Sequence, residues 1–122
     1  MKYFVEGEHL LVDGKKMSKS LGNVYTLRDL GRRGFEPLDF RHFVLGAHYR
    51  TQLNFTWKSL EAARNARLGI LNSLERLRNA HAGGNLKDEN ETLKVIAAIQ
   101  KQFHASLADD LNTPRSLALL NE

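Results

Sequence analysis

The stretch WKSLEAARNARLGILNSLERLRNA, from Trp57 to Ala80, has the clearest periodicity in the sequence. Apolar side chains recur in it every three or four residues, at Leu60, Ala63, Ala66, Ile70, Leu74 and Leu77. This spacing places them on one face of an α-helix, and the preceding Thr56 is a suitable N-cap. We therefore expect one long amphipathic helix, which ends before the pair Gly83-Gly84.

A second long helix is expected over residues 88–108. Its apolar face would contain Leu93, Ile96, Ala97, Phe103 and Leu107. Because the linker between the two long helices is short, we expect them to pack antiparallel. Thr113 and Pro114 then predict the N-cap and first residue of a third helix. A helix that ends at residue 122 is too short to be stable in isolation, so we expect this chain to be part of a longer protein.

The N-terminal part predicts smaller elements. Residues 3–12 are β-prone, Asp13-Gly14 is a hairpin turn, and residues 15–17 form the short second arm. Two small helices are expected next, over residues 27–33 and 38–48. Thr26 with Asp29 approximates a capping box for the first, and Pro37 suits the opening position of the second. Residues 49–55 are expected to form a loop.

These elements predict a mainly α fold. A short β-hairpin and a basic loop precede the small helices and the antiparallel long-helix pair, which is part of a helical bundle. The chain has no cysteine, which excludes disulfides and thiolate metal sites within it. It has no apolar run of the ~20 residues that a membrane span needs, so no membrane partner is expected.

The charge is unevenly distributed along the chain. It has 18 basic and 14 acidic residues, for a formal net charge of +4. Residues 1–58 contain ten basic and six acidic side chains, whereas residues 59–122 contain eight of each. We therefore expect a basic, ligand-binding first half and a neutral helical scaffold after it.

The motif Lys16-Met17-Ser18-Lys19-Ser20-Leu21-Gly22-Asn23 carries the strongest chemical signal. Two lysines lie three positions apart, with serine hydroxyls between and after them and a glycine that lets the backbone approach a ligand closely. Such a loop can wrap a polyphosphate, because it combines positive charge with directional hydrogen bonds. The competing interpretation is a solvated basic turn, which would be favoured for an isolated pair of lysines.

All eight residues of this motif resemble the second signature of the class I aminoacyl-tRNA synthetases. The resemblance implies a loop that closes over ATP while an aminoacyl adenylate forms. Lys19 would stabilise charge on the leaving pyrophosphate, with Lys16 assisting as the second catalytic lysine. The ATP-binding residues would be Lys16, Met17, Ser18, Lys19, Ser20, Gly22 and Asn23.

Further stretches are similar to the cysteinyl-tRNA synthetases within this class: residues 9–14, 26–30, 47–55 and 109–115. The resemblance implies ATP-dependent activation of cysteine and its transfer to tRNA(Cys), in the cytoplasm. Residues 1–55 would hold the ATP loop and the stem-contact region at the end of the catalytic part. Residues 56–122 would be the N-terminal part of a C-terminal helical, tRNA-binding domain.

The nucleotide-binding sheet, the HIGH-type signature and the zinc ligands of that family have no counterpart in this sequence. We therefore expect zinc in the full-length protein but no metal in this segment, where His42 and His48 are six positions apart and do not share a helix face. The remaining catalytic domain of the same chain would be a partner. Alone, this segment is expected to be inactive.

The resemblance implies that the residues after the loop would face the inside of the bend in the tRNA. The candidate tRNA contacts are Arg32, Arg33, Arg50 and Lys58. The alternative is a solubilising surface with local ion pairs, which suits Arg28 and Arg41. Two other functions stay open: a related ligase that joins cysteine to an amino sugar, and a stand-alone RNA-binding module derived from a synthetase.

Overall fold

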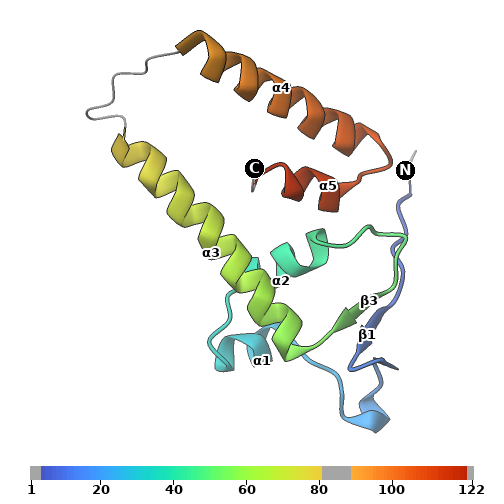
Figure 1. Ribbon diagram of the computed structural model, residues 1–122. Helices are drawn as coiled ribbons and strands as arrows, with labels where there is room; N and C mark the ends of the chain where they lie inside the picture. Colours follow the sequence, from blue (N-terminus) through green and yellow to red (C-terminus); the bar gives the residue numbers. More distant parts are fainter. Residues whose placement is uncertain (1–3, 81–88, 121–122) are drawn as a thin grey trace. The chain divides into compact units, whose positions relative to one another are not determined.

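A computed structural model describes residues 4–80 and 89–120. The chain divides into two compact units, Met1–Arg67 and Leu68–Glu122. The long helix α3 (Trp57–Ala80) begins in the first unit and ends in the second (Figure 1). The domain boundary predicted between residues 55 and 56 is not tested by this division and stays a prediction.

The first unit contains a small sheet in the order β2-β1-β3. Strands β1 (Leu10–Val12) and β2 (Lys15–Lys16) form the predicted antiparallel hairpin. Its turn residues Asp13 and Gly14 both have positive φ, 48° and 74°, as a type I′ turn requires.

The third strand, β3 (Leu53–Phe55), pairs parallel to β1, and the two lie side by side in Figure 1. The prediction of a loop over the whole of residues 49–55 is therefore wrong. Three residues are too few to show an alternating pattern, and the pairing partner lies far away in the sequence. The side chain of Asn54 joins β3 to the hairpin turn, because the Gly14 N–H donates to Asn54 Oδ1 at 2.8 Å.

Two short helices follow the hairpin. Helix α1 (Leu27–Arg32) has the predicted capping box, in which the Thr26 N–H donates to Asp29 Oδ2 at 2.9 Å and the Asp29 N–H donates back to Thr26 Oγ1 at 3.3 Å. Hydrogen bonds from Thr26 lower the pKa of Asp29 below its usual value. Helix α2 (Pro37–Leu45) ends three residues earlier than predicted, with Gly46 as its C-cap.

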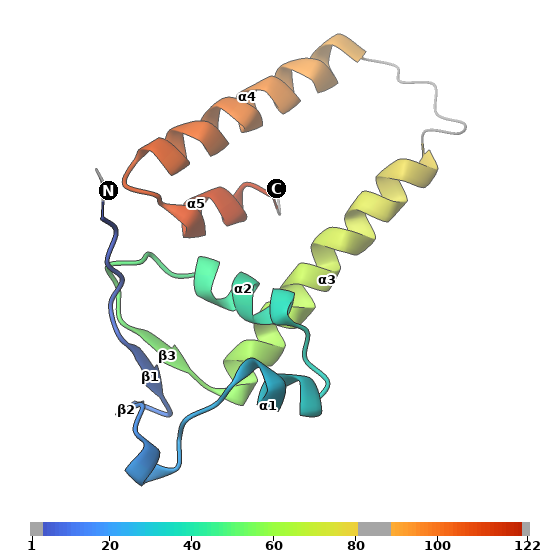
Figure 2. The ribbon, with the colours of Figure 1, turned by 180° about the vertical axis from the view of Figure 1, so that it is seen from behind.

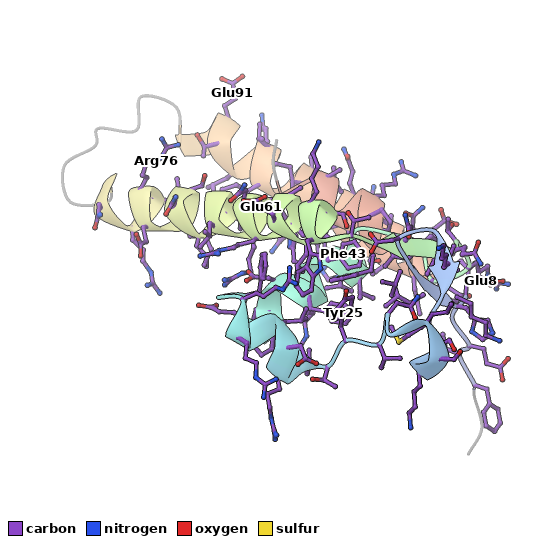
Figure 3. The ribbon with its side chains drawn as sticks, turned by 90° about the horizontal axis from the view of Figure 1, so that it is seen from below. Glu8, Tyr25, Phe43, Glu61, Arg76 and Glu91 are labelled. Carbon is purple, nitrogen blue, oxygen red and sulfur yellow. The ribbon has the colours of Figure 1, made fainter. Side chains whose placement is uncertain are left out.

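The core of the first unit takes one buried side chain from each of five elements: Val12, Leu30, Phe43, Phe55 and Leu60. Figure 3 shows the labelled side chains of Tyr25 and Phe43 on the side of α3 where α1 and α2 lie. Trp57 packs on this core, with ring-centroid distances of 5.2 Å to Phe55 and 5.0 Å to Tyr25. Trp57 is thus a packing residue at the start of α3.

An ion-pair network ties α2 to α3. Asp39 is fully buried and accepts a hydrogen bond from Arg67 Nε at 2.8 Å and another from the Glu36 N–H at 2.8 Å. Arg67 also donates to Glu36 Oε2 at 2.7 Å. The hydrogen bond to Asp39 is the main cause that raises the pKa of Arg67 above its usual value. These contacts join α3 to the beginning of α2.

The second unit contains the end of α3 with α4 (Glu89–Ala108) and α5 (Thr113–Ala118). Helices α4 and α5 pack together, and Ser106, Ser116 and Leu119 are buried there. The N-cap of α5 is Asn112, whose Oδ1 accepts from the Arg115 N–H at 3.3 Å. The prediction of Thr113 as the cap is wrong by one residue, because the Asn112 side chain takes that role.

The mainly α fold with a short hairpin is confirmed. The antiparallel packing of α3 against α4 stays a prediction, since the segment that joins them, including Asp88, lies outside the described residues. Leucine side chains of both apolar faces are exposed, among them Leu74, Leu77 and Leu93. Within residues 4–80 and 89–120, no helix combines the length and apolarity that a membrane span requires.

Candidate functional site

Residues 16–23, here called the lysine loop, leave the sheet at the end of β2 and lead back toward α1 (Figure 2). The loop contains one 3₁₀ turn, η1 (Lys19–Leu21). The Leu21 N–H donates to the Ser18 carbonyl at 3.2 Å, and the Gly22 N–H donates to the Lys19 carbonyl at 3.1 Å. Gly22 has φ +64°, a left-handed conformation that glycine adopts without steric cost.

The Asn23 side chain joins both ends of the lysine loop. Its Oδ1 accepts from the Ser18 N–H at 2.8 Å, and its Nδ2 donates to the Lys16 carbonyl at 3.1 Å. Within the loop, the hydroxyls of Ser18 and Ser20 form a hydrogen bond of 2.7 Å. The loop is therefore a wound structure with its own hydrogen bonds and not an open turn.

Met17 anchors the lysine loop to the protein core. Its side chain is half-buried and packs against the core of the first unit. It also lines an apolar hollow of about 130 Å³, together with residues of β1, α1 and α2. The side chain of Met17 thus points to the core, while the lysines on either side of it are exposed.

Lys16 and Lys19 supply the positive charge of the loop. Among the residues that the structure describes, neither lysine forms an ion pair. Lys15 is exposed as well, so residues 15–20 supply three exposed lysines and the hydroxyls of Ser18 and Ser20. This arrangement has the chemistry of an anion site, because ammonium and hydroxyl groups are both donors to phosphate oxygens.

Two of the four predicted tRNA-contact residues lie at one hollow. Arg32 and Arg33 line it with Val24, Tyr25, Asp29 and Trp57, and its volume is about 310 Å³. The guanidinium of Arg33 lies 4.0 Å above the centroid of the Trp57 ring. Arg32 forms an exposed ion pair with Asp29 at 3.3 Å. Arg33 is thus held on a ring, while Arg32 is held by a surface ion pair.

Arg50 and Lys58 are elsewhere. Arg50 follows α2 and lies 5.1 Å from the centroid of the Tyr49 ring, and Lys58 is exposed in the first turn of α3. Neither residue lines the hollow of Arg32 and Arg33. Two of the four candidates therefore line the arginine hollow and two do not.

Two features around the candidate site were not foreseen from the sequence. Tyr25 joins Trp57 in lining the arginine hollow; its place next to the helix cap Thr26 was the available signal. Asn54 fixes the hairpin turn that precedes the lysine loop, but no sequence signal links residues forty positions apart. In the part of the chain that the structure describes, no group of three or more His, Cys, Asp or Glu side chains fits a metal ion.

Comparison with known proteins identifies the family. The family model described as the tRNA synthetases class I (C) catalytic domain matches residues 1–65. A cysteine–tRNA ligase of Chlamydia felis is 44% identical over 120 residues, which cover 98% of this chain and 25% of that protein. A cysteine–tRNA ligase of Opitutus terrae is 46% identical over 119 residues, covering 98% of this chain and 23% of that protein.

A third relative, the cysteine–tRNA ligase of Leptospira interrogans serovar Lai, is 44% identical over 126 residues, covering 100% of this chain and 26% of that protein. The chain thus spans about a quarter of the length of the curated relatives it matches. The family match includes the hairpin, the lysine loop, both arginine positions of the hollow and the start of α3. The chain therefore belongs to the class I tRNA synthetases (C), the family of the cysteine–tRNA ligases.

Proposed function

We propose that this chain is the segment of a cysteine–tRNA ligase that closes over ATP and contacts tRNA(Cys). The observation that carries the proposal is the wound lysine loop, with its exposed Lys16 and Lys19, in a chain 38–46% identical to ligases of that name. The rest of the catalytic domain would lie in the remainder of a longer chain. That remainder would also supply the cysteine pocket and its zinc.

In the proposed first step, a carboxylate oxygen of cysteine attacks the α-phosphorus of ATP. The bond between that phosphorus and the bridging oxygen breaks, and pyrophosphate leaves with the electron pair. Negative charge grows on the leaving phosphates, so an ammonium beside them stabilises the transition state more than the ground state. We assign this role to Lys19, with Lys16 assisting, and assign the loop residues Met17, Ser18, Ser20, Gly22 and Asn23 to the ATP site.

In the proposed second step, the cysteinyl group passes from the adenylate to the terminal ribose of tRNA(Cys), and AMP leaves. Arg32, Arg33, Arg50 and Lys58 would contact the tRNA backbone. The net charge of +4 over residues 1–58 supports this surface, because phosphate contacts by basic side chains supply much of the affinity for nucleic acids. Such a ligase would act in the cytoplasm.

The test uses the complete ligase that contains this segment. Lys19→Ala should lower cysteine-dependent ATP–pyrophosphate exchange by about 10²–10³-fold, the usual cost of removing a preorganised charge partner. The matched control is Lys101→Ala, because Lys101 is an exposed lysine on α4 and its loss should leave exchange unchanged. Equal exchange in the two variants would contradict the role of Lys19.

An assay of the wild-type enzyme also distinguishes a cysteine–tRNA ligase from the related ligase that joins cysteine to an amino sugar. The enzyme should charge a tRNA(Cys) transcript with cysteine, and retention of that tRNA should weaken as salt increases. Transfer of cysteine to an amino sugar without tRNA charging would identify the other class of ligase instead.

A further inference from the structure

Asn23 is the last residue of the lysine loop, and its side-chain amide makes two hydrogen bonds to the backbone at the start of the loop. It accepts from the N–H of Ser18 and donates to the carbonyl of Lys16. We propose that Asn23 is a positioning residue: it clamps the lysine loop in its wound form and acts on catalysis through Lys19. This inference rests on the proposed function, and within the proposed ATP site it gives Asn23 a specific role, which is to hold the loop backbone.

The two hydrogen bonds of Asn23 close a segment of backbone that contains Lys19. Lys19 lies between the two clamped positions and Asn23 itself, and its own carbonyl accepts from the Gly22 N–H. The backbone around Lys19 is thus held on both sides, while its ammonium stays exposed. The Oδ1 and Nδ2 atoms of Asn23 each have one backbone partner, and the residue is half-buried.

A clamp of this kind affects the transition state more than the binding of ATP. An unclamped loop spreads Lys19 over more positions, and each ångström of misplacement of a charged group is costly in rate. Ground-state binding of ATP depends less on that position, because charge on the leaving phosphates develops only as the bond breaks. Loss of the clamp should therefore lower kcat while leaving the KM for ATP nearly unchanged.

The discriminating experiment is a double-mutant cycle on the complete ligase, measured by cysteine-dependent ATP–pyrophosphate exchange. Asn23→Ala alone should lower kcat by about 10- to 100-fold with the KM for ATP changed less than about twofold. In the Lys19→Ala background the same substitution should cost less than about twofold, because a residue that acts through Lys19 has nothing left to position. Asn23→Asp keeps an acceptor for the Ser18 N–H, so its kcat should lie between that of the wild type and that of Asn23→Ala.

Asn112→Ala is the matched control. The Asn112 side chain also accepts a hydrogen bond from a backbone N–H, that of Arg115, but it caps α5 in the second unit. Its removal should change exchange less than about twofold. Trypsin gives a readout independent of activity: cleavage after Lys16 and Lys19 should become several-fold faster in Asn23→Ala and stay unchanged in Asn112→Ala.

Three results would overturn the inference: additive losses in the Lys19→Ala background, a raised KM for ATP as the main effect of Asn23→Ala, or equal behaviour of Asn23→Ala and Asn112→Ala. Each of these presupposes that the wild-type enzyme shows cysteine-dependent exchange. If the wild type shows none, the proposed function itself is overturned, and the clamp's catalytic role with it. The two failures are therefore distinguishable.

Discussion

Arg33 and Arg32 are neighbours in sequence but are held by different forces. Arg33 lies on the face of Trp57, a cation–π contact worth about 0.5–1 kcal/mol at an exposed site. Among the described residues, Arg32 has only its exposed pair with Asp29, and such pairs contribute little. Arg33 loses less conformational freedom on meeting a phosphate, because its guanidinium is already oriented. The Arg33 guanidinium covers one face of the Trp57 ring, so a nucleic-acid base has less room to stack there. This favours a phosphate group of the tRNA as the partner of Arg33.

Substitution of Arg33 tests this difference. Arg33→Ala in the complete ligase should weaken tRNA(Cys) binding several-fold and reduce the slope of log K against log salt by about 0.7–0.9, the value of one phosphate contact. The control is Arg41→Ala, since Arg41 is exposed on α2 and lines no arginine hollow. Equal slopes in Arg33→Ala and Arg41→Ala, measured by filter retention across a salt series, would exclude Arg33 as a phosphate contact.

At the scale of elements, the ion pair between Asp39 and Arg67 joins α2 to α3, and a substitution of Arg67 tests how much it stabilises the chain. Asp39 is 0% exposed and the side chain of Arg67 is 15% exposed, so Arg67→Met leaves an unpaired carboxylate inside the protein. Breaking a buried pair on one side costs about 3–5 kcal/mol. This loss of stability should be visible in thermal unfolding of the 122-residue chain. The fluorescence of its single tryptophan, Trp57, can follow the unfolding.

Arg76→Met is the matched substitution for this measurement, because Arg76 lies on the same helix and is exposed. It should change stability by less than about 0.5 kcal/mol. Replacing both partners, as Asp39→Leu with Arg67→Met, should recover part of the stability, since no charge is then left buried. A loss in Arg67→Met no larger than that in Arg76→Met would show that the pair does not hold α2 against α3.

The elements also show what sequence can and cannot predict. The span of α3 and the capping box of Thr26 depend on local patterns, and both were predicted. Strand β3 and the bond between Asp39 and Arg67 were not, because each depends on a partner far along the chain. The lysine loop was predicted as a site from its residue types, whereas the clamp by Asn23 needed backbone geometry that no local pattern encodes.

At the scale of the whole molecule, the apolar faces of the two long helices need a partner. Leu74 is 52% exposed and Leu77 64% on α3, while Leu93 is 55% and Ile96 50% exposed on α4. Covering apolar surface stabilises a protein by about 25 cal/mol per Å². Each helix offers the other a stripe of the same kind, and the short linker in the sequence favours their antiparallel packing.

Disulfide trapping tests that packing directly, because the natural chain has no cysteine. In an antiparallel pair, positions nearest the linker on each helix face one another, so Leu77→Cys with Leu93→Cys should form a disulfide under mild oxidation. Leu77→Cys with Phe103→Cys is the control, since Phe103 lies almost three helical turns further along α4. Bridging needs Cα atoms within about 7 Å, so only the first pair should cross-link, as measured by non-reducing electrophoresis. Equal cross-linking of both pairs, or of neither, would contradict antiparallel packing and leave the two apolar stripes to other partners.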